Sequence, residues 1–288
     1  MAARSAIWDL NRKNSLMTDT PTPPLPPFYR APQPLNAAVH ADWRLRDGDI
    51  TFAADTPHLP IVIGELAAAA RSFPIVFAAG DAQPVVILGL ERRNLFVADG
   101  HWSEDAYVPA YVRRYPFGFI TTVNRDGFAL AIDAGSDRVV QDGEDGAAWF
   151  DDGQPSSLTR EALAFCGAFQ SEATATRDFA DALVAQDLLV DRRADATLPD
   201  GRTLGLDGFR IVDGAKLAAL PEPVVLEWHN QGWLALVHFH LASLDRFQDL
   251  LVRQARLAPV TPASSNTASD RPSQEVQVTP ATAEPLPA

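Results

Sequence analysis

The sequence contains one cysteine and only two lysines among its 288 residues. A single thiol, Cys166, cannot form an internal disulfide, and it excludes a cysteine-rich metal site. Because nearly all basic residues are arginines, the positive charge lies on planar guanidinium groups that bind carboxylates bidentately. We therefore expect the cationic side chains to occupy paired and partly buried positions.

Long apolar runs are also missing. No run approaches the roughly 20 residues that a transmembrane helix requires, so we expect no integral membrane segment. Residues 1–17 include basic side chains but lack the apolar core of a secretory signal, and Met17 is an alternative start to Met1. These features and the free cysteine predict a cytoplasmic location, with signal-peptide-independent export to the cell surface as the alternative.

A basic surface is the third feature that the sequence lacks. The net charge is -13, from 24 basic and 37 acidic residues. Binding to nucleic acid or to anionic membranes needs a basic face, so we expect neither. The 47% hydrophobic content is enough for a sizeable core. The sequence does not determine the oligomeric state.

Proline-rich and polar segments flank the expected folded region. Residues 1–27 end in a run of proline and threonine, and residues 258–288 are small, polar and rich in proline. Both compositions are typical of disordered segments. We therefore predict a single folded domain over residues 28–257.

In the first half of that domain, the sequence predicts short strands. Continuous β-branched runs at 74–79 and 84–90 indicate buried strands, preceded by a short alanine-rich helix at 64–73. Residues 117–132 predict a hairpin whose turn spans 124–127, and a second hairpin is expected around Asp47-Gly48-Asp49.

The second half predicts a long helix followed by shorter elements. Residues 157–186 carry an apolar stripe at helical spacing, with Ser157 or Thr159 as the cap. A hairpin about residues 199–201 follows, then a short helix capped by Asp213 and further helices to 257, with Ser243 capping the last. The predicted fold class is α+β: a mixed, largely antiparallel sheet packed against a long helix and C-terminal helices.

Residues 107–119, YVPAYVRRYPFGF, combine aromatic, proline and arginine side chains at the junction of the two halves. Guanidinium groups bind carboxylates, and tyrosines provide a large contact area at low entropic cost. The hypothesis is an anion- or peptide-binding surface formed by Tyr107, Tyr111, Arg113, Arg114 and Tyr115. The alternative places the aromatic rings in the core and pairs the arginines with acidic residues.

Two histidine patterns suggest metal binding as a further alternative. His238 and His240 would share one face of a strand and bind zinc there, but would point in nearly opposite directions on a helix. His40 and Asp42 match half of a two-histidine, one-carboxylate iron site, with His101 or His240 as the distal ligand.

No complete catalytic motif accompanies these residues. The chain lacks HExxH, GxSxG, Walker and GxGxxG patterns, and the acidic turns at 142–145 and 151–152 lack the spacing of a calcium loop. We therefore predict no cofactor.

Seven segments of this chain match a known family in order, and together they cover almost all of residues 28–255. They are FYRAPQPLN, ELAAAARSFPIVFAAG, PVVILGLERRNLFV, YVPAYVRRYPF, FQSEATATRDFADALVAQDLL, LPDGRTLGLDGFRIVDGAKLAALP and GWLALVHFHLASL. In these segments the chain resembles the bacterial SapC family. The resemblance implies an association with surface-layer protein or its assembly, and it supplies no catalytic residue.

The expected function follows from the resemblance and from the missing motifs. It is that of a non-enzymatic accessory or binding protein, associated with bacterial surface-layer or cell-envelope protein and acting on a protein or peptide partner. The first alternative is a metal-dependent enzyme using iron or zinc at His40 and Asp42 or at His238 and His240. The second is a structural subunit of the surface layer.

Overall fold

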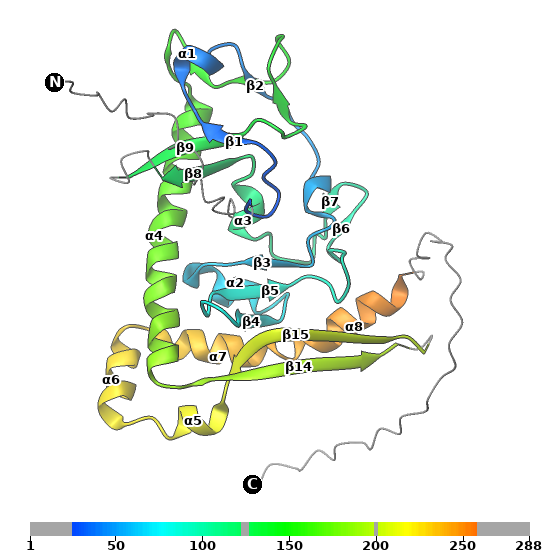
Figure 1. The fold of residues 1–288 in the computed structure, drawn as a ribbon, viewed down its shortest axis with the longest axis vertical. Helices are drawn as coiled ribbons and strands as arrows, with labels where there is room; N and C mark the ends of the chain where they lie inside the picture. The colour runs from blue at the N-terminus through cyan, green and yellow to red at the C-terminus, as the bar shows by residue number, and fades with distance from the viewer. Residues whose placement is uncertain (1–24, 122–126, 199–200, 258–288) are drawn as a thin grey trace, which may run out of the picture. The chain divides into compact units, whose positions relative to one another are not determined.

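A computed structural model describes residues 25–121, 127–198 and 201–257 of the chain (Figure 1). Helices and antiparallel sheets both contribute, so the predicted α+β class is confirmed. The segments predicted to be disordered, 1–27 and 258–288, lie outside the described residues except for 25–27.

The largest sheet has five strands in the order β14-β15-β4-β5-β3. The strands are β3 (His58–Pro60), β4 (Ile75–Ala78), β5 (Pro84–Ile87), β14 (Leu189–Thr197) and β15 (Thr203–Val212). The β-branched runs form β4 and β5 as predicted, and β14 and β15 form the predicted hairpin. Phe209 pairs with Ala78, which joins segments from both halves of the chain in one sheet.

A second group of strands lies beside the N-terminal half of the long helix at 157–185, whereas the five-stranded sheet lies toward its C-terminal half (Figure 1). One sheet has the order β1-β9-β8, from β1 (Pro32–Pro34), β8 (Phe117–Thr121) and β9 (Phe128–Asp133). The predicted hairpin at 117–132 is therefore confirmed; residues 122–126 of its connection lie outside the described part. The remaining strands are β2 (Arg44–Leu45), β6 (Val97–Ala98), β7 (His101–Trp102), β10 (Val139–Val140), β11 (Ala147–Ala148), β12 (Phe150–Asp151) and β13 (Gln154–Pro155).

The hairpin predicted around Asp47-Gly48-Asp49 is wrong. Strand β2 pairs with β10 and β11, and the chain then enters the 3-10 turn η1 (Thr51–Ala53). The Asp49 carboxylate accepts a hydrogen bond from the Thr51 backbone N–H at 3.0 Å. Such a contact between an aspartate and the backbone two residues on favours a turn over an extended strand.

The long helix α4 (Ser157–Ala185) is present as predicted, but its cap lies one residue earlier. Ser156 is the capping residue, and its hydroxyl accepts a hydrogen bond from the Thr159 backbone N–H. The prediction of Ser157 or Thr159 as the cap is therefore wrong. Ser156 has extended backbone geometry, which places its oxygen over the first turn. The short helical segments earlier in the chain are α1 (Ala37–His40), η2 (Ile63–Glu65), α2 (Leu66–Ala69) and α3 (Ala110–Arg113).

The C-terminal helices follow the predicted order. They are α5 (Gly214–Ala218), α6 (Glu222–Asn230), α7 (Trp233–Ser243) and α8 (Arg246–Arg256). Asp213 caps α5 as predicted. Gly232 separates α6 from α7 and has a φ angle of 75°, a left-handed conformation that favours glycine.

Ser243 was predicted to cap the last helix, and this prediction is wrong. The residue lies at the end of α7, and its hydroxyl accepts a hydrogen bond from the Ile75 backbone N–H at 2.9 Å. This contact ties α7 to strand β4, which is distant in sequence. Short-range sequence patterns contain no information about such a pairing.

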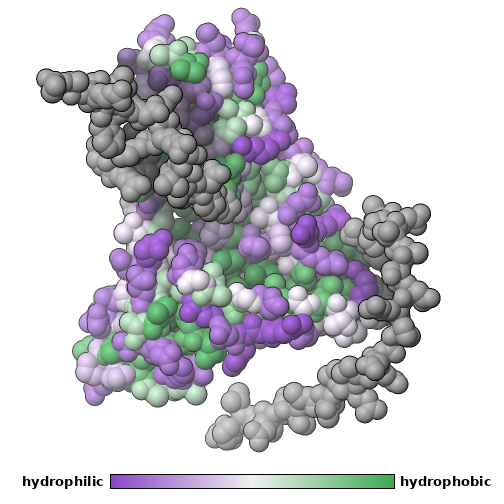
Figure 2. Space-filling model, in the orientation of Figure 1, coloured by the Kyte–Doolittle hydropathy of each residue, from purple (hydrophilic) through white to green (hydrophobic). Residues whose placement is uncertain are grey.

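Two hydrophobic clusters form the interior. The larger contains Phe77 of β4 and Phe179 of α4, and the smaller is built from Phe117, Ile132, Trp149 and Cys166. Helix α4 contributes to both clusters. On the face drawn in Figure 2, hydrophilic residues cover most of the projecting surface.

The segment 107–119 joins these two clusters. Tyr111 and Tyr115 are buried in the larger cluster, whereas Phe117 belongs to the smaller one. This stretch is therefore the junction between the two interiors.

Candidate functional site

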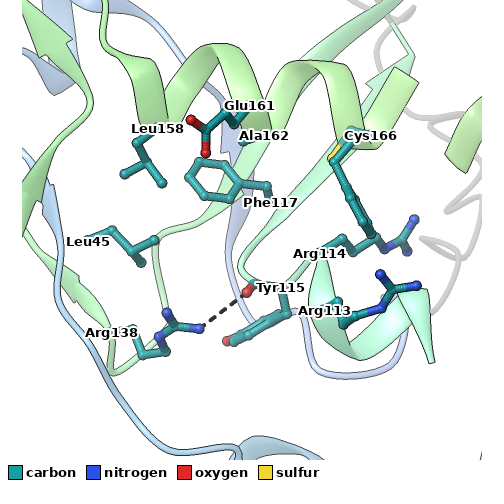
Figure 3. A pocket seen from close by; sticks show the side chains of 11 residues that line it. Leu45, Arg113, Arg114, Tyr115, Phe117, Arg138, Leu158, Glu161, Ala162 and Cys166 are labelled. Atoms are coloured by element: carbon teal, nitrogen blue, oxygen red, sulfur yellow. Dashed lines mark hydrogen bonds between the residues drawn. The ribbon is translucent and has the colours of Figure 1, made fainter. Parts of the chain in front are cut away.

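A pocket of about 300 Å³ opens where residues 113–117 face helix α4 (Figure 3). Its polar lining consists of Arg113, Arg114, Arg138 and Glu161. The rest of the lining is mainly apolar and includes Leu45, Tyr115, Phe117, Leu158, Ala162, Phe165 and Cys166. The volume is at the lower end of the range found for small-ligand sites.

A buried glutamate fixes the start of the segment that carries the arginines. Oε1 of Glu65 accepts hydrogen bonds from the Ala110 backbone N–H at 2.6 Å and from the Tyr107 hydroxyl at 3.0 Å. Its Oε2 accepts a third from the Val62 backbone N–H at 3.1 Å. Since Glu65 is only 4% exposed, these bonds satisfy a carboxylate that water hardly reaches. The first turn of α3 is therefore held rigidly.

A buried aspartate fixes the other end of the segment. Oδ2 of Asp133 accepts a hydrogen bond from the Tyr115 hydroxyl at 2.8 Å. Its Oδ1 accepts three more from the backbone N–H groups of Arg30, Ala31 and Gly135. Burial, with a contribution from Asp133, raises the pKa of Tyr115 to about 12, so this phenol remains a hydrogen-bond donor at neutral pH.

Arg114 lies between two aromatic rings. Its guanidinium carbon is 4.1 Å from the ring centroid of Tyr111 and 4.4 Å from that of Phe169. Stacking occupies the faces of the guanidinium group and leaves its N–H donors, which lie in the plane, for other partners. Among the described residues, no acceptor bonds its buried Nε. An unsatisfied buried donor costs roughly 1–3 kcal/mol, so an added acceptor here would be stabilising.

Arg113 and Arg138 line the same pocket, and hydrogen bonds hold them to the protein. Arg113 donates from Nε to the Val108 carbonyl at 3.1 Å and from Nη2 to the Tyr107 hydroxyl at 3.1 Å. Arg138 donates to the backbone carbonyls of Tyr115 and Arg46 at 3.5 Å and 3.4 Å, distances at which hydrogen bonds are weak. Both guanidinium groups therefore retain capacity for a further acceptor.

Within residues 25–121, 127–198 and 201–257, none of these three arginines forms an ion pair. The buried acids Glu65 and Asp133 are engaged by tyrosines and backbone N–H groups instead. Glu161, on the α4 wall of the pocket in Figure 3, pairs with no described arginine. With three arginines against Glu161, the pocket therefore carries a net positive charge beside a mainly apolar wall, where charge-assisted hydrogen bonds to an anion are strong.

The structure divides the predicted arginine–tyrosine surface into two parts. Arg113 and Arg114 line the pocket, whereas Tyr111 and Tyr115 are buried and Tyr107 is partly buried against Glu65. The tyrosines therefore position the arginines and do not offer a large contact surface.

Sequence reasoning missed Arg138 and Glu161 as pocket residues. Glu161 follows Leu158 by three residues and precedes Phe165 by four, so helical spacing places the three on adjoining positions of α4. Arg138 has no comparable signal, because its place follows from the pairing of β10 with β2.

His238 and His240 do not form a joint metal site. Both lie on helix α7, where residues two apart point to different sides. His240 is fully buried, and its Nδ1 donates to the Ile75 carbonyl while Nε2 accepts from the Val212 backbone N–H. Neither ring nitrogen has a lone pair left for a metal. Burial lowers the pKa of His240 to about 4, which keeps the ring neutral.

His40 and Asp42 are also not brought together as ligands. His40 is buried, with its ring centroid 4.5 Å from that of Trp43, whereas the Asp42 side chain is exposed. His101 is exposed on β7, and its Nδ1 lies 2.7 Å from the Asp99 carbonyl. In the described part of the chain, no three histidine, cysteine, aspartate or glutamate residues are grouped to hold a metal.

Fold and pocket define an α+β protein with an arginine-lined cavity at the junction of two hydrophobic clusters. The chain belongs to the SapC family, whose family model matches residues 35–250. Neither a curated protein nor a solved structure matches the chain. None of the described helices combines the length and the hydrophobicity needed to cross a bilayer.

Proposed function

We propose that this protein is a non-enzymatic binding protein associated with bacterial surface-layer or cell-envelope protein. In this proposal, the pocket lined by Arg113, Arg114 and Arg138 holds an anionic group of a protein or peptide partner. The observation that carries the proposal is that three arginines line one pocket and form no ion pair among the described residues. The association with the surface layer rests on the family to which the chain belongs.

The contacts that position the arginines support a binding role. Glu65 and Asp133 fix both ends of the segment, and aromatic stacking fixes Arg114. A side chain that is already ordered loses little entropy when a ligand binds. The Nε–H of Arg114, which bonds no described acceptor, is therefore better suited to a ligand than to stabilising the fold.

A capture experiment tests this proposal. The tagged protein and an Arg114→Gln/Arg138→Gln variant are each used to capture proteins from the envelope fraction of the native bacterium, and the captured proteins are identified by mass spectrometry. An Arg177→Gln/Arg192→Gln variant is the matched control, because it removes the same charge from exposed positions on α4 and β14.

The expected result is an identified surface-layer or envelope protein that the wild type and the control capture, and that the pocket variant loses by at least about tenfold. Circular dichroism establishes that all three proteins are folded. Equal capture by the pocket variant would overturn the proposal, as would capture of no envelope protein by the wild type.

A further inference from the structure

The wall of the pocket opposite the arginines is apolar. Helix α4 contributes Leu158, Ala162 and Phe165, and strand β8 contributes Phe117. Figure 3 shows Leu158 and Phe117 on the α4 side, Arg138 across the cavity on one side of Tyr115, and Arg113 and Arg114 on the other side of Tyr115. A ligand that fills this space therefore combines an anionic group with an apolar group.

The lining of the cavity carries a net positive charge. Three arginines outnumber Glu161 there, so the cavity attracts an anion. A carboxylate matches the fork of an arginine in two parallel hydrogen bonds and carries a single charge.

Helix N-termini commonly bind phosphate, and one backbone N–H group at each of two helix starts near this cavity is already engaged. The Ala110 backbone N–H at the start of α3 donates to Glu65 at 2.6 Å. In the first turn of α4, the Thr159 backbone N–H donates to the Ser156 hydroxyl. The guanidinium groups are the cationic donors that line the cavity, and their forks suit a carboxylate.

The size of the cavity limits the ligand. At about 300 Å³ it holds one residue or a small organic acid, and it is too small for a folded domain. A protein partner would thus enter with a single residue.

We propose that this pocket binds a carboxylate carried on an apolar group, as found at the C-terminus of a peptide that ends in an aliphatic residue. This inference rests on the proposed function and specifies its ligand. The carboxylate accepts hydrogen bonds from arginines that line the pocket, and the apolar group contacts Phe117, Leu158 and Phe165. A free aliphatic acid offers the same chemistry, so the test includes both sources.

Isothermal titration calorimetry with defined ligands tests the inference on the full chain. N-acetyl-leucine presents the carboxylate and the apolar group, whereas N-acetyl-leucinamide lacks the charge. Inorganic phosphate presents charge without the apolar group. The peptide N-acetyl-Ala-Ala-Leu and 4-methylpentanoate represent the two sources.

We expect saturable binding of N-acetyl-leucine that is at least tenfold tighter than that of the amide or of phosphate. Arg114→Gln and Arg138→Gln each weaken it by at least fivefold, and Arg192→Gln leaves it unchanged. Arg138 makes only long hydrogen bonds to the protein, so its variant should fold even if Arg114→Gln does not.

Tighter binding of the tripeptide than of 4-methylpentanoate assigns the site to a peptide terminus. Equal affinity for the two ligands assigns it to a small acid. Either result supports carboxylate recognition. Tighter binding of phosphate than of N-acetyl-leucine, or equal binding of the acid and the amide, overturns the inference. Neither result changes the capture experiment, which judges the proposed function separately through the dependence of an envelope partner on Arg114 and Arg138.

Discussion

The guanidinium carbon of Arg114 lies 4.1 Å from the centroid of the Tyr111 ring. Phe169 of helix α4 covers the guanidinium group as well, at 4.4 Å. This stacking holds a positive charge in one orientation without a carboxylate partner among the described residues. A strongly acidic chain thus keeps an arginine unpaired at a cavity.

Replacing Phe169 with leucine should loosen Arg114 while keeping most of the apolar volume. Loss of one cation–π contact removes about 0.5–1 kcal/mol, which corresponds to a two- to fivefold weaker affinity for N-acetyl-leucine. Calorimetry measures the change. Phe119→Leu is the matched control, because Phe119 stacks on Phe128 of the neighbouring strand. An equal loss of affinity in both variants would count against a role for the stacking.

Asp133→Asn should destabilise the fold. The amide keeps one acceptor oxygen and places an NH2 donor at the other position, facing either the three backbone N–H groups bound to Oδ1 or the Tyr115 hydroxyl bound to Oδ2, at a cost of about 2–4 kcal/mol. Urea unfolding measures the loss. Asp137→Asn, which removes an exposed ion pair with Arg30, should change the unfolding free energy little. Similar losses in the two variants would show that Asp133 is no anchor.

The stability of the protein should fall as the pH drops from about 6.5 to 4. Burial lowers the pKa of His240 to about 4 in the folded state, so the unfolded chain takes up the proton first. The contribution of His240 to the free energy of unfolding is fully present above pH 6.5 and falls by roughly 3 kcal/mol as the pH drops to 4. Burial also lowers the pKa of His40, which acts in the same direction.

Urea unfolding at several pH values measures how much His240 contributes to the pH dependence of the unfolding free energy. A His240→Gln variant should be less stable at pH 7 and show a flatter dependence between pH 6.5 and 4. His238→Gln, on the exposed side of the same helix, should retain the wild-type slope. An unchanged slope in His240→Gln would refute the assignment.

Cys166 should react slowly in the folded protein. Burial raises the pKa of its thiol to about 11, and the thiolate is the reactive form. Alkylation by iodoacetamide at pH 8 is expected to be about 100-fold slower than in urea, and slower still with N-acetyl-leucine bound. Mass spectrometry follows the adduct. Comparable rates in the folded and unfolded states would show that the side chain is accessible.

Local sequence patterns were sufficient for many elements of the fold. The alternating and β-branched runs at 117–132 and 189–212 predicted two hairpins, and the apolar stripe predicted α4. The resemblance to the SapC family agrees with the family model match. In each of these elements, the hydrogen bonds join residues near in sequence.

Contacts between distant segments could not be predicted. The side chain of Ser243 bonds to Ile75, and Arg44 pairs with Val140, because tertiary packing brings these residues together. The pocket residues show the same difference between local and distant contacts. The sequence predicted Arg113 and Arg114 as a pair, but Arg138 joins them only through the fold.

Side-chain NMR of the arginines tests the central claim, that this pocket is an anion-binding site. The Nε–H signals of protein labelled with ¹⁵N-arginine are assigned with Arg113→Lys, Arg114→Lys and Arg138→Lys variants and followed during titration with N-acetyl-leucine. We predict saturable shifts of these three signals and unchanged signals of Arg177 and Arg192. Shifts spread evenly over all arginines, or no saturable shift at Arg114, would contradict the claim.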